Sequence, residues 1–206
     1  MLQNRVDPFG NLIKTKARGA WMGNRGVIHN ADQQIIRPFK LNAWITCLLE
    51  FKNRKREVMT PDRWTELFFM DEATSFAAGH RPCAECRRAD FTRFKSFWLL
   101  GNPEYKFDMK TPIQKIDQIL HKERIGPDKS KIIFNEFSQL IPNGSFVAID
   151  KEPYLVFDQE IFRWTPFGYE DGIALPDKTR LDVLTPKSIV NTFRAGYLPE
   201  SRKINL

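Results

Sequence analysis

Cysteine and histidine are both scarce in this chain, which has three of each among its 206 residues. Three cysteines cannot close a framework of paired disulfides, so we expect a reducing compartment in which the thiols stay free or bind a metal. No apolar run approaches the roughly 20 residues that span a bilayer, and the N-terminal stretch MLQNRVDPFG lacks the apolar core of a secretory signal. The sequence therefore predicts a soluble cytoplasmic protein with no membrane partner.

Recognisable catalytic patterns are also missing. Residues 104–206 contain no paired carboxylates, no Ser-His-Asp arrangement and no glycine-rich phosphate loop, and the chain lacks the double histidine of HNH-like nucleases. These absences weigh against an enzyme without excluding one.

The chain does have enough apolar material for a sizeable core, because 42% of its residues are hydrophobic and 13% are aromatic. The character of the sequence changes near position 103. We therefore predict an α+β fold with two domains. Residues 1–103 form a basic, metal-binding domain of β-hairpins and helices, and residues 104–206 form a helix followed by a small β-rich, barrel-like unit.

Local patterns predict the individual elements. The first 26 residues are interpreted as an irregular basic arm because glycines and charges dominate them. We expect hairpins over residues 27–37 and 43–59. Further helices are expected at 87–100, 110–124 and 189–195, and strands at 146–149, 154–157, 161–164 and 181–184. Trp164, Phe167 and Tyr169 are interpreted as a hydrophobic plug, with a stacking platform for bases as the alternative.

The densest chemistry lies in residues 68–88, FFMDEATSFAAGHRPCAECRR. Asp71 is placed to cap a short helix, and Gly79 suits the left-handed residue that ends one. Pro82 stiffens the entry to the next turn. In that turn the Cys83-x-x-Cys86 spacing puts two sulfurs on the same side, where they can bind a soft or borderline metal. The pattern predicts a metal knuckle between two helices.

This stretch resembles the zinc-binding N-terminal domain of the Ada family of methylated-DNA response proteins. The matching residues are Ala77, Ala78, Gly79, Arg81, Pro82, Cys83, Cys86 and Arg87, while His80 stands where the family has an aromatic residue. The resemblance implies a four-thiolate zinc site that contacts DNA. It also implies that a cysteine of an earlier Cys-x-x-x-Cys pair accepts a methyl group from a backbone phosphotriester. Here the only earlier cysteine is Cys47.

A structural zinc site needs four ligands, and Cys83 and Cys86 supply two. Cys47 is the best third candidate, because the Ada-like layout brings a cysteine from the sheet to the knuckle; a buried core residue is the alternative. His80 is our candidate for the fourth ligand and His29 its rival. Asp71 or Glu85 remains open as well. We therefore predict zinc as the cofactor.

The net charge of +7 is unevenly distributed. Residues 1–103 contain 17 Lys and Arg against 10 Asp and Glu, a difference of +7, whereas residues 104–206 contain 15 of each. Arginine suits phosphate because its planar fork donates two hydrogen bonds. We expect a nucleic-acid partner, DNA rather than RNA. The candidate contacts are Arg54, Lys55, Arg56, Arg81, Arg87 and Arg88.

Three functions compete. The first is a zinc-stabilised nucleic-acid-binding protein connected with DNA repair or its regulation. The second is a DNA-acting enzyme, either a sacrificial methyl acceptor that uses Cys47 or a metal-dependent nuclease that uses a histidine such as His29. The third is a metal-free scaffold that binds other proteins. The knuckle, the resemblance and the charge together favour the first.

Overall fold

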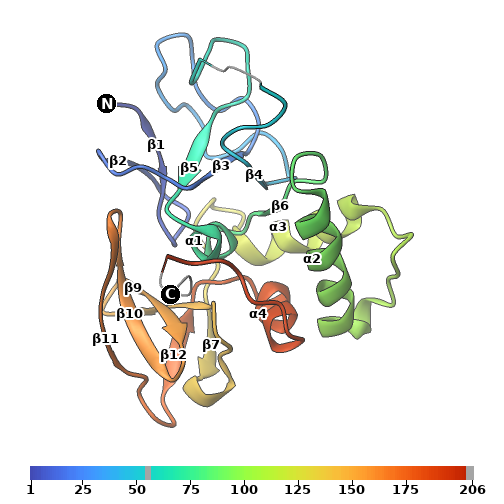
Figure 1. The fold of residues 1–206 in the computed structure, drawn as a ribbon, viewed down its shortest axis with the longest axis vertical. Helices are drawn as coiled ribbons and strands as arrows, with labels where there is room; N and C mark the ends of the chain where they lie inside the picture. Colours follow the sequence, from blue (N-terminus) through green and yellow to red (C-terminus); the bar gives the residue numbers. More distant parts are fainter. Residues whose placement is uncertain (54–56, 203–206) are drawn as a thin grey trace.

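The computed structural model describes residues 1–53 and 57–202, whose helices and strands form the α+β protein that the sequence predicts (Figure 1). In this part of the chain the strands make two six-stranded sheets. The first sheet is mixed, with the spatial order β2 (Leu12–Lys14), β1 (Gln3–Val6), β5 (Leu67–Phe69), β3 (Trp21–Asn24), β4 (Ile45–Cys47) and β6 (Arg81–Pro82). The second is antiparallel, with the order β11 (Gly168–Ala174), β10 (Glu160–Thr165), β9 (Glu152–Phe157), β8 (Phe146–Ile149), β12 (Arg180–Val183) and β7 (Phe134–Phe137).

Short and medium helices complete the fold. They are α1 (Glu72–Ala77), α2 (Arg88–Gly101), α3 (Ile113–Arg124) and α4 (Lys187–Arg194), with 3-10 turns at Pro103–Tyr105 and Ser138–Leu140. Across residues 1–53 and 57–202, none of the helices has both the length and the apolar character needed to cross a membrane.

The first 26 residues are built into the first sheet, so the predicted irregular arm is wrong. They supply β1, β2 and β3. Two glycines that suggested a loop allow strands to approach closely. A Cβ at Gly19 would stand 2.5 Å from the carbonyl oxygen of Phe69, and one at Gly23 would stand 2.6 Å from the carbonyl oxygen of Ile45. Glycine here indicates tight backbone packing, which its sequence context alone does not reveal.

Of the two predicted hairpins within residues 27–59, the first forms as a short pairing and the second does not form among the described residues. In the first, His29 pairs antiparallel with Ile35, and the Ile36 N–H donates to the Ile28 carbonyl at 2.9 Å. In the second, the long strand shortens to β4, which pairs with β3 and β6 instead of with residues 57–59. Pairing with distant strands buries Thr46 and Cys47, and that burial outweighs the local turn signal.

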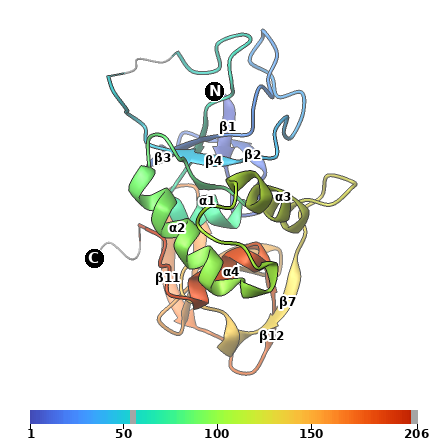
Figure 2. The same cartoon turned by 90° about the vertical axis from the view of Figure 1, so that its right-hand side faces the viewer.

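Helix α1 lies between the two sheets (Figures 1 and 2), and all six of its residues are buried. One face joins the second sheet in a core cluster that contains Met70, Ala73, Ala77, Phe146, Leu155, Phe162, Trp164 and Leu184. The other face places Phe76 among the helices, in a cluster with Phe94, Trp98, Ile116, Leu120, Ile189, Phe193 and Tyr197. Both clusters combine residues from the two sides of position 103.

In the second half, the structure has the expected helices and four central strands, with small shifts at their ends. The edge strands β7 and β11 were not predicted. β11 contains Gly168, Gly172 and charged residues, a composition typical of a turn. It becomes a strand because β10 offers it an unpaired edge.

Two of the three predicted plug residues pack onto α1. Trp164 is buried and its indole N–H donates to the Thr74 hydroxyl at 3.1 Å. The Tyr169 hydroxyl donates to the Asp71 carboxylate at 2.7 Å. Phe167 is 68% exposed. The Asp71 carboxylate also caps α1 by accepting the Thr74 N–H at 2.8 Å, so one buried acid joins α1 to β11.

Replacing Asp71 with alanine removes the helix cap and leaves the Tyr169 hydroxyl without its acceptor. We expect the free energy of unfolding to fall by about 2–4 kcal/mol, since a lost cap costs about 1 kcal/mol and a buried unpaired group about 1–3 kcal/mol. Urea denaturation followed by circular dichroism measures the change. Tyr169→Phe, which keeps the cap, is the matched control and should cost about 1 kcal/mol. Equal losses in the two variants would contradict the capping role.

Candidate metal centre

Three cysteines from separate parts of the chain meet at the β6 edge of the first sheet. Cys47 ends β4, Cys83 follows β6, and Cys86 lies two residues before α2. Their sulfur atoms all lie within 4.8 Å of one another, and they form the one cluster of potential metal ligands found in the described part of the chain. We call Cys47, Cys83 and Cys86 the cysteine cluster. This cluster can hold a metal ion.

The parallel pairing of β4 with β6 positions the first two cysteines. Thr46 lies opposite Pro82 in the ladder, and the Cys83 N–H donates to the Thr46 carbonyl at 2.9 Å. The residues that follow this pair are Cys47 and Cys83 themselves. Strand pairing, rather than proximity in sequence, therefore brings their sulfurs together.

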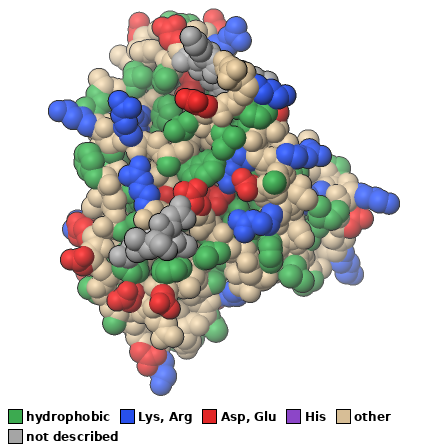
Figure 3. Space-filling model, in the orientation of Figure 1, with side chains coloured by type: hydrophobic (Ala, Val, Ile, Leu, Met, Phe, Trp, Pro, Cys, Tyr) green, Lys and Arg blue, Asp and Glu red, His purple; other side chains and the backbone are tan. Residues whose placement is uncertain are grey.

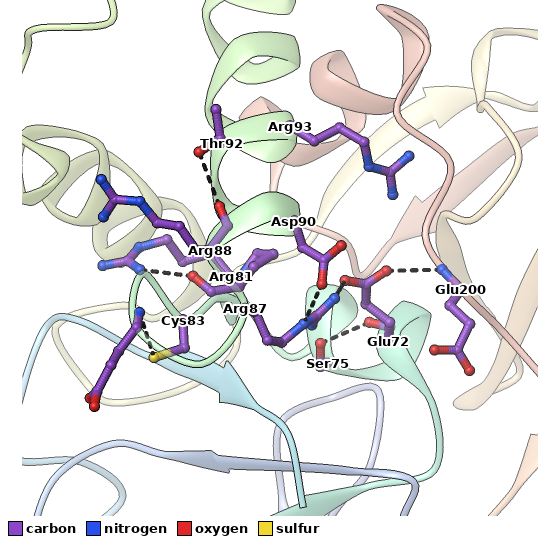
Figure 4. A network of polar contacts seen from close by, with 12 residues as sticks. Glu72, Ser75, Arg81, Cys83, Arg87, Arg88, Asp90, Thr92, Arg93 and Glu200 are labelled. Carbon is purple, nitrogen blue, oxygen red and sulfur yellow. Dashed lines mark hydrogen bonds and ion pairs between the residues drawn. The ribbon is translucent and has the colours of Figure 1, made fainter. Parts of the chain in front are cut away.

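The third cysteine arrives through the tight turn that the Cys83-x-x-Cys86 spacing predicts. The Arg87 N–H donates to the Cys83 carbonyl at 3.2 Å and closes the turn. The Glu85 N–H points at the Cys83 sulfur at 3.4 Å (Figure 4). A backbone N–H aimed at a sulfur stabilises the thiolate form, which is the form that binds metal.

The electrostatics of the cluster favour one negative sulfur even without an ion. The hydrogen bond from Cys47, together with backbone N–H groups, lowers the pKa of the Cys83 thiol to about 5. The same hydrogen bond and burial raise the pKa of Cys47, because it is the donor. Cys83 is therefore the thiolate around which a cation would assemble.

A cavity of about 180 Å³ lies beside the cysteine cluster. Besides the cysteines, it is lined by Asn24, Ile45, Leu48, Phe51, Trp64 and Glu85. Three protein ligands next to a cavity leave room for a fourth, exchangeable ligand such as water or a substrate atom. Glu85 is the acidic residue in this lining, so one of the predicted alternatives for the fourth ligand stays near the sulfurs.

The structure places His80 elsewhere, in an aromatic and cationic setting. Its ring packs against Trp44 and Phe69, with centroids 5.1 and 4.6 Å away. Its Nε2 accepts a hydrogen bond from Arg25 Nε at 3.3 Å. Burial, followed by the nearby charges of Arg25 and Arg124, lowers the pKa of His80 well below its usual value. In the structure, His80 is therefore a neutral imidazole that accepts a hydrogen bond from Arg25.

The other two alternatives are also engaged away from the sulfurs. His29 Nδ1 lies 2.6 Å from the Thr65 hydroxyl, and its Nε2 lies 3.2 Å from the Thr60 carbonyl. Asp71 caps α1. In the described residues, neither side chain belongs to the cysteine cluster.

Two of the arginines predicted to contact nucleic acid are buried in ion pairs. Arg81 forms a bidentate pair with Asp117 on α3, with both distances 2.7 Å. Arg87 pairs with Glu72 on α1 and, at 2.9 Å, with Asp90 (Figure 4). The two arginines are 4% and 5% exposed. Their guanidinium groups hold the helices against the knuckle, so contact with a phosphate requires opening these pairs.

Of the other four residues predicted to contact nucleic acid, one lies in the described part of the chain. Arg88, at the start of α2, is exposed and points away from the Arg87 pair (Figure 4). Arg54, Lys55 and Arg56 lie outside the described residues. Within the part of the chain that the structure describes, Arg88 is the predicted contact that is exposed to solvent, and its role stays a prediction.

The buried charged residues of α3 were not predicted from the sequence. Asp117 and Arg124 lie on the buried side of α3 together with Ile116 and Leu120. A charged residue within an apolar stripe is a signal of buried pairing. The His121 ring packs against Phe39, and its Nδ1 lies 3.0 Å from Nη2 of Arg124. Asp117, His121 and Arg124 thus form a second group of polar side chains, on α3.

Comparison of the chain with protein-family models, with curated proteins and with solved structures finds no match. The likeness to the Ada zinc domain thus rests on residues 68–88 alone, and no family is assigned. The cysteine cluster is the feature that defines the site.

Variants of the cysteine cluster and of His80 should differ in metal binding. We expect Cys83→Ser and Cys47→Ser to lose the bound metal together with cooperative unfolding, because two thiolates do not hold a structural ion. We expect His80→Gln to keep the metal and to melt at a lower temperature, because Arg25 loses a partner. Elemental analysis and thermal melts measure both quantities. Loss of metal in His80→Gln would identify His80 as the fourth ligand.

Proposed function

We propose that the chain is a zinc protein that binds nucleic acid, DNA rather than RNA. The observation that carries this proposal is the convergence of Cys47, Cys83 and Cys86 at the start of α2. In a tetrahedral zinc site with Zn–S bonds of 2.3 Å, sulfurs stand about 3.8 Å apart, which suits a cluster of this size. Thiolate donors favour zinc over magnesium or calcium.

In this proposal the metal has a structural role. The three thiolates would join β4 to the turn between β6 and α2, two parts of the chain that are remote in sequence. A bound zinc ion supplies charge neutralisation and a fixed geometry. The chain's own contribution is the turn that presents Cys83 and Cys86 together, with Arg88 directly beyond it. The metal would therefore hold the start of α2 in the orientation that exposes Arg88.

Positive charge supports a polyanionic partner. All of the net charge lies in residues 1–103. Within the described residues of that half, the exposed cations are Lys14, Lys16, Arg18, Arg37, Lys40, Lys52, Arg63, Arg88 and Arg93. On the face shown in Figure 3, basic side chains are interspersed with acidic ones. Such a surface favours salt-dependent contact with a phosphate backbone rather than sequence-specific binding.

A second function has one observation in its favour. The cysteine cluster borders a cavity, and the Cys83 thiol has a lowered pKa, so a substrate atom can approach a nucleophilic sulfur. The thiolate would attack the methyl carbon of a DNA phosphotriester, and a zinc ion held by Cys47, Cys83 and Cys86 would keep the sulfur deprotonated. An S–C bond forms, the C–O bond breaks, and the phosphodiester leaves with the bonding electron pair. The protein would be consumed in the process.

Two neighbouring arginines test DNA binding. We expect Arg88→Gln to weaken binding of a duplex oligonucleotide several-fold, to reduce the salt dependence by about one phosphate contact and to leave stability unchanged. Arg87→Gln should instead lower the free energy of unfolding by about 3–5 kcal/mol, because it strands the buried Glu72 carboxylate. Fluorescence anisotropy and urea denaturation measure the two effects. Absence of binding by the zinc-loaded wild type at low salt would refute the proposal.

Methyl acceptance has a separate readout. Incubation with DNA that carries methyl phosphotriesters should increase the mass of one cysteine peptide by a CH₂ unit if the second function is correct. Fragmentation of the modified peptide in the mass spectrometer shows whether Cys47, Cys83 or Cys86 carries the added group. An unchanged mass spectrum in a protein that binds the same DNA would leave the binding function alone.

A further inference from the structure

A second cavity, of about 490 Å³, is lined in part by Trp44, the residue just before β4. It is lined by Arg25, Trp44, Ala78 and Arg124 together with Lys131 and residues from the β1–β2 turn. It shares no lining residue with the cavity beside the cysteines. We call it the cationic cavity, because four positively charged side chains line it: Arg25, Arg124, Lys129 and Lys131.

Arg25 and Arg124 reach this cavity from inside the protein, and each is 2% exposed. Both guanidinium groups lie against the ring of Trp44, at 3.9 and 4.0 Å from its centroid. Their hydrogen bonds go to neutral acceptors. Arg25 donates to the Gly10 carbonyl at 3.0 Å and to His80, and Arg124 donates to the Gly79 carbonyl at 2.7 Å.

The charge on these groups is poorly compensated. None of the ion pairs between described residues includes Arg25, Arg124 or Lys131. Arg25 Nη2 and Arg124 Nε are buried and have no hydrogen-bond partner in that part of the chain. The Lys131 ammonium donates to the Ala77 carbonyl. Asp7 is the carboxylate whose field reaches Arg25 and Lys131. Asp117, which pairs with Arg81, is the carboxylate whose field reaches Arg124.

This arrangement contrasts with the other buried arginines of the protein. Arg81 and Arg87 each pair with a buried carboxylate. A buried cation without such a partner is strongly destabilising unless an anion compensates it. Enclosure and the charge of Arg25 lower the pKa of Lys131 to about 7, and burial lowers the pKa of Arg25 to about 9.

The backbone is adapted to hold the cations close together. Gly79 has φ +82°, and a Cβ at this position would stand 2.5 Å from Cδ of Arg124. Only glycine satisfies both the left-handed conformation and the contact. The helix-ending glycine of the Ada-like stretch thus serves Arg124 rather than the metal.

The rest of the lining indicates the kind of ligand. The cavity is much larger than an inorganic phosphate, and Phe9, Leu12, Ile35 and Pro38 give it an apolar side. Guanidinium and ammonium groups such as those that line this cavity are the donors that proteins use for phosphoryl oxygens. We propose that the cationic cavity binds a small organic phosphate, with the phosphoryl group on Arg25, Arg124 and Lys131 and the organic part against the apolar side.

Calorimetry and thermal melts on the full chain test this site, with inorganic phosphate, a phosphomonoester with an apolar group such as phenyl phosphate, and chloride at equal ionic strength. We expect both phosphates to raise the melting temperature and the monoester to bind more tightly, because the apolar side adds contacts. Lys131→Met should weaken binding about tenfold or more, as expected for loss of one charge-assisted hydrogen bond. Lys122→Met is the control. It removes an exposed charge from α3 and should leave binding within about twofold.

Lys131 is chosen because Arg25→Met and Arg124→Met remove buried contacts to Trp44 and can unfold the protein. Two outcomes would overturn the proposal: equal effects of phosphate and chloride, or equal losses in Lys131→Met and Lys122→Met. Tighter binding of inorganic phosphate than of the monoester would overturn the organic part. These results do not depend on zinc content or DNA affinity.

The pH dependence gives an independent readout, with sulfate as a probe of constant charge. An anion favours the protonated form of Lys131, so sulfate affinity should fall as pH rises from 6 to 8, through the pKa of about 7. Lys131→Met should remove most of this dependence. An unchanged dependence in that variant would count against the site. The other charged or titratable groups at the cavity are Asp7, Arg25, His80, His121, Arg124 and Lys129.

Discussion

The cysteine cluster and the cationic cavity both depend on the parallel pairing of β4 with β6. Two backbone hydrogen bonds, from Arg81 to the Trp44 carbonyl at 3.1 Å and from Cys83 to the Thr46 carbonyl at 2.9 Å, join the two strands. At one end of the ladder Cys47 meets Cys83, and at the other Trp44 meets His80. A shift of one residue in this register would separate the sulfurs and displace the Trp44 ring from the arginines.

The buried arginines of the protein are stabilised in two different ways. Desolvation makes an unpaired buried ion costly, so each guanidinium group needs compensating contacts. Arg81 and Arg87 receive carboxylates from α3 and α1, so they tie helices to the knuckle. Arg25 and Arg124 receive carbonyls, an imidazole and an aromatic face, which leaves net positive charge beside a cavity. The first solution builds structure, and the second keeps a site ready for an anion.

Much of the local structure was predictable, and the reasons are local. Asp71 caps α1, and Gly79 follows it with a positive φ, because capping and left-handed backbone depend on a few neighbouring residues. The turn from Cys83 to Cys86 likewise follows from its spacing. The predictions failed where distant strands competed with turns, as in the short β4 and the ordered N-terminal strands. Hydrophobic alternation cannot show which strand a segment will pair with.

The sequence by itself determined that three cysteines were available, that two of them share a turn, and that positive charge is concentrated in one half of the chain. Tertiary structure alone decided that Cys47 joins them and that His80 serves Arg25. It also decided which arginines face solvent, since Arg87 and Arg88 are adjacent yet one is buried and the other exposed. The physical reason is that burial and ion pairing depend on contacts between residues far apart in sequence, which composition and spacing do not contain.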